Sequence, residues 1–69
     1  MISVHHDVKM AVESKLRVLR DFYVVDIHNE ERIRRQLFKA VEDEPNKDFN
    51  TVLDRVAKQL ITEKLNSVS

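Results

Sequence analysis

Three histidines are the side chains best suited to metal binding or proton transfer: His5, His6 and His28. The first two are adjacent, so they point to different sides of a helix or a strand and do not form the i,i+4 pair of a helical metal site. Ligation would require His28 to fold back beside them with Asp7 or Glu31. The spacing therefore predicts polar surface residues, and we expect no metal and no cofactor.

The densest group of acids is Glu42, Asp43, Glu44 and Asp48, which invites comparison with a calcium-binding loop. An EF-hand loop places its ligands at alternating positions, with a glycine at the sixth and a glutamate at the twelfth. This chain has no glycine, and Pro45 interrupts the run. The pattern therefore predicts a solvated acidic connection between two elements.

Covalent catalysis has little support in the sequence. No serine lies in a Gly-x-Ser-x-Gly turn, and the absence of cysteine removes thiol chemistry, disulfides and cysteine-based zinc sites. The neighbouring acids Glu30 and Glu31 diverge on a helix. A chain of 69 residues also has little room for a pocket of several hundred cubic ångströms. We therefore predict that the protein is not an enzyme.

A basic helix face is the best candidate for contact with a phosphate or an acidic partner, and it consists of Arg32, Arg35 and Lys39. The alternative is a solvated, salt-bridged face, because Glu30–Arg34 and Glu31–Arg35 are i,i+4 pairs in the favourable order. The whole chain carries 12 basic and 12 acidic residues. Since nucleic-acid binders usually have a basic excess, this balance disfavours nucleic acid as a partner.

Helical periodicity indicates three helices, at about 8–26, 30–43 and 48–65, with frayed ends at about 1–6 and 66–69. The prediction is one small all-α domain over residues 1–69. Asn29 is the expected N-cap of the second helix. Pro45 ends that helix, because the residue before a proline is pushed out of the α region. Asp48 or Asn46 is expected to cap the third.

The segment 22–27 is ambiguous. Its aromatic and β-branched residues favour a short strand, but the same residues also suit the last turn of the first helix. The choice matters because a strand needs a pairing partner, for which an identical strand from a second chain is the simplest source.

Several apolar residues lie outside the apolar face of their predicted helix. Others make the apolar face of the first helix wider than one neighbouring helix can cover. We predict an interface made of Phe22, Val24, Val25, Phe38 and Ile61. A chain this short buries a marginal core, and without disulfides it gains most from regular packing or oligomerisation. A homodimer, a protein partner or both are therefore expected.

The sequence analysis thus predicts a non-enzymatic, self-associating helical module for protein–protein interaction or regulation. In the alternative, the order of a strand at 22–27 followed by two helices resembles the ribbon-helix-helix layout, which implies a dimeric DNA-binding transcriptional regulator. Neither face of that strand carries a lysine or arginine. The longest apolar run spans four residues, 22–25, so no membrane segment is expected, and the first residues do not resemble a signal peptide. The cytoplasm is the predicted compartment.

Overall fold

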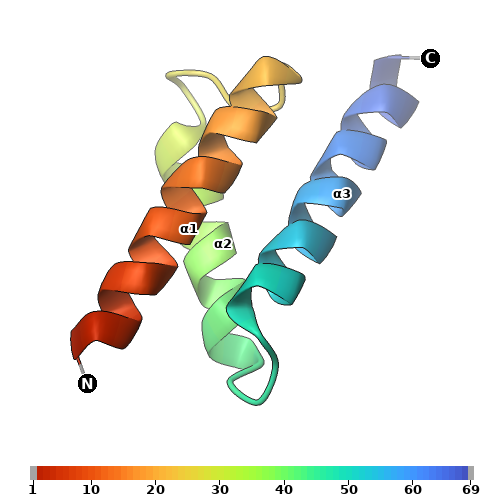
Figure 1. Cartoon of the computed structure of the whole chain (residues 1–69). Coiled ribbons are helices and arrows are strands. Elements are labelled where there is room, and N and C mark those ends of the chain that lie inside the picture. The colour runs from red at the N-terminus through yellow and green to blue at the C-terminus, as the bar shows by residue number, and fades with distance from the viewer. Residues whose placement is uncertain (1, 69) are drawn as a thin grey trace.

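The computed structural model describes residues 2–68 and contains three helices: α1 (Ile2–Asp21), α2 (Glu30–Asp43) and α3 (Phe49–Val68). They run up, down and up, so that each helix contacts both of the others (Figure 1). The molecule is elongated, with principal extents of 43 × 23 × 16 Å. The predicted all-α, three-helix fold is confirmed.

All three helices contribute to one hydrophobic core, and so does the connection between α1 and α2. The buried side chains are Val8, Val12, Leu16 and Leu19 of α1, Val25 of the connection, Ile33 and Leu37 of α2, and Val52, Leu53, Val56 and Ala57 of α3. Within each helix they recur at spacings of three and four residues, which is the repeat that lines one helix face. Burying that face stabilises helices whose propensity alone would leave them marginal.

The bounds of α2 agree with the prediction, and Glu44 leaves the helix immediately before Pro45 as expected. The other two helices differ in length from the prediction. The α1 helix begins at Ile2 and ends at Asp21, five residues before the predicted end, whereas α3 runs on to Val68. Residues 2–6 and 66–68, expected to be frayed, therefore lie within helices, while residues 1 and 69 lie outside the described range.

The segment 22–27 is neither a strand nor a helical turn, and no strand occurs between residues 2 and 68. It opens with a Schellman motif, in which Val24 N–H donates to the Leu19 carbonyl at 2.9 Å and Tyr23 N–H donates to the Arg20 carbonyl at 3.0 Å. Tyr23 adopts the left-handed conformation of that motif, with φ of 62°. The ribbon-helix-helix layout begins with a strand, and segment 22–27 does not form one, so the resemblance does not extend to that element.

The connection closes on a reciprocal pair of side chains. Asp26 Oδ1 accepts hydrogen bonds from the backbone N–H groups of His28, at 2.8 Å, and Asn29, at 3.0 Å. Asn29 Oδ1 accepts in return from Asp26 N–H at 2.8 Å, which is the logic of a capping box. Asn29 occupies the predicted N-cap position of α2, which confirms that prediction, but its side chain makes no capping hydrogen bond to the helix and reaches back along the loop instead.

Within the described range, no helix has both the length and the apolar character needed to cross a membrane. The predicted compartment stays a prediction. The described residues also contain no group of three or more metal-ligating side chains.

Candidate functional site

The five residues of the predicted interface do not form one surface. Val25 was wrongly included, because its side chain is buried in the core at 3% exposure. Val24, Phe38 and Ile61 are half-buried and pack against that core. Only Phe22 is well exposed, and Phe38 belongs to the opposite end of the bundle, in the second half of α2.

A different set of apolar side chains is exposed at the end where α1 stops and α3 finishes. This loop-end patch consists of Val18, Phe22, Tyr23, Ile27 and Leu65. Tyr23 and Ile27 are 82% and 87% exposed. In Figure 1 the C-terminal end of α1, the loop to α2 and the last turns of α3 all lie at this upper end. Among residues 6–67, Met10, midway along α1, is the one other large hydrophobic residue with an exposed side chain.

The loop that carries Tyr23 and Ile27 is held by backbone hydrogen bonds. The Schellman motif fixes its start, where Val24 packs against the core near the buried Leu19. The Asp26–Asn29 pair fixes its end, and Asn29 Nδ2 also donates to the Val24 carbonyl at 3.0 Å. These bonds present Tyr23 and Ile27 on a fixed frame, which lowers the conformational entropy lost when a partner binds.

The predicted interface shares only Phe22 with this patch and missed Val18, Tyr23, Ile27 and Leu65. Periodicity predicts regular structure over 22–27, in which alternate residues are buried. Isolated apolar residues in a loop do not follow a periodic pattern, so nothing in the pattern indicated that they are exposed. The one available signal was the sequence Asp26-Ile27-His28-Asn29. There Ile27 stands alone between polar residues, and both Asp and Asn favour turns.

Charges of both signs surround the loop-end patch. Asp21 and Asp26 are its acids, and Arg17 and Lys64 its bases; none of the four has an ion-pair partner among the described residues. Hydrogen bonds from the backbone N–H groups of His28 and Asn29 lower the pKa of Asp26, and the charge of Lys64 lowers it further.

The predicted basic face, Arg32, Arg35 and Lys39, is exposed along α2 and finds no carboxylate partner within residues 2–68. The predicted Glu30–Arg34 pair is confirmed, with 2.9 Å between Arg34 Nη2 and Glu30 Oε2. The predicted Glu31–Arg35 pair is wrong, because Glu31 pairs with Arg34 instead. The face therefore remains available to an anionic partner, and that role stays a prediction.

Arg34 is occupied because it joins α2 to α1. Its Nε donates to Glu13 Oε2 at 2.8 Å, and Glu30 also accepts from Arg20 at 3.0 Å. The hydrogen bonds with Glu13 and Glu30 raise the pKa of Arg34 above its usual value, and the same contact with Arg34 lowers the pKa of Glu13. This network links α1 to α2 along their shared face.

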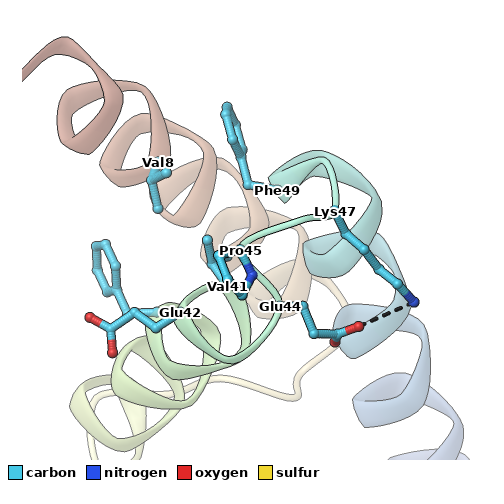
Figure 2. Close-up of a pocket in the computed structure, with 8 residues that line it drawn as sticks. Val8, Val41, Glu42, Glu44, Pro45, Lys47 and Phe49 are labelled. Atoms are coloured by element: carbon cyan, nitrogen blue, oxygen red, sulfur yellow. Dashed lines mark ion pairs between the residues drawn. The ribbon is translucent and has the colours of Figure 1, made fainter. Parts of the chain in front are cut away.

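At the opposite end, α2, the 44–48 connection and the start of α3 enclose a hollow of about 340 Å³. The residues that line it are Val8, Phe38, Val41, Glu42, Glu44, Pro45, Lys47 and Phe49. Figure 2 shows Glu42 and Phe49 on opposite sides, with Val41 and Pro45 between them and Val8 approaching from α1. The volume lies at the small end of the range for ligand sites.

Two of the three charged residues of this hollow neutralise each other. Glu44 accepts from Lys47 at 3.2 Å and forms a bidentate pair with Arg55 of α3, with Arg55 Nη1 3.1 Å from Glu44 Oε1. Hydrogen bonds from Arg55 and Lys47 lower the pKa of Glu44 to about 2. Glu42 is exposed and has no ion-pair partner in the described part of the chain.

The bundle thus offers an apolar patch at one end, an apolar hollow with a free carboxylate at the other, and a basic face on α2. The comparisons supply no family for it: no protein-family model matches the chain, and neither the curated proteins nor the solved structures give a match.

Proposed function

We propose that the protein is a non-enzymatic interaction module that forms a homodimer through the loop-end patch. The observation that carries this proposal is that five of the six large hydrophobic side chains exposed within residues 6–67 lie at one end of the molecule. Exposed apolar clusters of this kind mark interaction sites, whereas single exposed apolar residues need no explanation.

A second copy of the chain suits the patch better than an unlike partner. In a two-fold symmetric interface every residue of one surface meets a residue of the same surface, so the charges must be self-complementary. Asp21 and Asp26 can meet Arg17 and Lys64 of the other copy, and these four charges are unpaired within the described chain. A patch of one sign would repel its own copy.

The size of the domain supports the same conclusion. The chain exposes 5396 Å² of surface, and a standard interface covers about 800 Å² on each partner, which is about a seventh of that surface. Small domains without disulfides commonly gain stability by covering apolar surface in this way.

The test is the solution mass measured by light scattering across a dilution series. We expect a concentration-dependent dimer for the natural chain and a monomer for Ile27→Asp, because a buried unpaired carboxylate opposes association. Met10→Asp is the matched control: Met10 is also exposed but lies away from the patch, so this variant should still dimerise.

Two results would contradict the proposal. One is a natural chain that stays monomeric at every concentration, and the other is an equal loss of mass in the two variants. A parallel series with a short DNA duplex at low salt tests the alternative partner. A shift in mass that needs DNA and disappears as salt rises would favour the basic face of α2 instead.

A further inference from the structure

We propose that the hollow between Val8, Val41 and Phe49 binds a peptide segment of a protein partner, and that this segment carries one large apolar side chain flanked by lysine or arginine. This site lies at the end of the bundle opposite the loop-end patch, and its argument does not depend on dimerisation. It rests on the shape and lining of the hollow and on the sign of the charges around it.

The lining selects an apolar side chain. Five of its eight residues are apolar: Val8, Phe38, Val41, Pro45 and Phe49. They come from all three helices and the 44–48 connection, so the wall belongs to the folded core and exists before a ligand arrives. A preformed apolar recess of this kind takes a single anchoring side chain, as the central pockets of protein interfaces do.

The charges select basic neighbours for that side chain. Lys47 and Arg55 are both engaged by Glu44. Of the three charged residues that line the hollow, Glu42 alone has no ion-pair partner among residues 2–68, and it is acidic. The free carboxylate of Glu42 at the hollow attracts a basic residue and repels phosphate, so a basic peptide suits the site better than a nucleic acid or an anionic membrane.

The experiment titrates the full ¹⁵N-labelled chain with the blocked heptapeptide Ser-Ala-Lys-Phe-Lys-Ala-Ser and follows the backbone amide signals. We expect saturable shifts at residues 38–49 and around Val8, and not in the loop-end patch. Replacing the peptide's phenylalanine by alanine should weaken binding by about tenfold, because the apolar anchor is lost. Replacing both lysines by glutamate should weaken it about threefold, and added salt should reduce that difference.

Variants of the protein test the role of Glu42. Glu42→Lys should reverse the order of affinity, so that the glutamate peptide binds more tightly than the lysine peptide. Asp43→Lys makes the same change of charge at a neighbour that does not line the hollow, and it should keep the order. Both side chains are exposed, so both variants should fold.

Three results overturn the proposal. The first is the absence of shifts at about 10 mM peptide. The second is an equal response to the phenylalanine and alanine peptides. The third is an equal effect of Glu42→Lys and Asp43→Lys on the relative affinities of the lysine and glutamate peptides. That result would mean that the preference follows the net charge of the protein.

Discussion

At Tyr23 a bulky side chain occupies a backbone conformation that suits glycine. The Schellman motif needs a left-handed residue after α1, and this chain has no glycine to supply it. A residue with a Cβ atom in that region is less stable than glycine by about 1–2 kcal/mol. The strain persists because the hydrogen bonds to Leu19 and Arg20 and the packing of Val24 determine the turn.

We expect Tyr23→Gly to raise the free energy of unfolding by about 1 kcal/mol, since it relieves this strain. Tyr23→Ala is the matched variant, because it removes the aromatic ring and keeps the Cβ atom. Urea unfolding at low protein concentration should show the glycine variant to be the more stable of the two. Equal midpoints would mean that the turn carries no such strain. Both variants should associate more weakly than the natural chain.

At the scale of the elements, Glu44 ties the end of α2 to α3. Its carboxylate binds Arg55 in the second turn of α3 and Lys47 in the connection. The folded pKa of about 2 lies below the ordinary value of 4.5. The stability that this contact provides is therefore present above pH 4.5 and is lost as pH falls from 4.5 toward 2.

We therefore expect Glu44→Gln to be less stable than the natural chain at pH 7 and to approach it in stability as pH falls through this window. Urea midpoints at three pH values between 7 and 3 would measure the difference. Glu42→Gln serves as the control, because Glu42 has no ion pair within residues 2–68 and its substitution should leave the pH dependence unchanged. A Glu44→Gln deficit that stays constant with pH would contradict the assignment.

The helices themselves were largely predictable, because their apolar residues recur at three and four positions and Pro45 marks the end of α2. The 22–27 segment was not. Its composition favours a strand or a helix, and the outcome depends on two further conditions, one non-local and one local. One is the burial of Val25 among side chains of all three helices; the other is the reach of Asn29 back to Asp26 and Val24. Neither condition can be predicted from the composition of the segment.

The prediction of which apolar residues are exposed depended on the same segment. Because Val25 faces the core, Tyr23 and Ile27 are the exposed apolar residues of the segment, and Val25 drops out of the predicted set. The hollow depends on how Val8 meets Phe49 from a distant part of the chain, which no local pattern reports. The basic face was placed correctly on an exposed side of α2, because it follows from helical spacing alone.

At the scale of the whole molecule, the core is small and concentrated. The radius of gyration is 12.1 Å, against about 11 Å for a compact chain of this length, so part of the molecule extends beyond the core. Residues 62–67 of α3 are all exposed. Stability therefore rests on the few side chains that are fully buried.

We expect Leu53→Ala to lower the free energy of unfolding by about 2–5 kcal/mol, because Leu53 is completely buried and its truncation leaves a cavity. That loss is a large fraction of the stability of so small a domain. Leu65→Ala is the control, since Leu65 is exposed and its truncation should change stability by less than about 0.5 kcal/mol at low protein concentration. Similar thermal melts for the two variants would contradict the assigned core.

The patch and the hollow lie at opposite ends of a molecule 43 Å long, and this has a consequence for valency. A dimer joined at the loop ends carries two hollows that face away from each other, roughly 70 Å apart. A flexible linker matches that distance with its average reach only at about 160 residues, and even fully extended it needs about 20. A partner with two closely spaced anchor segments must therefore bridge two separate dimers, and such a partner would build chains of alternating molecules.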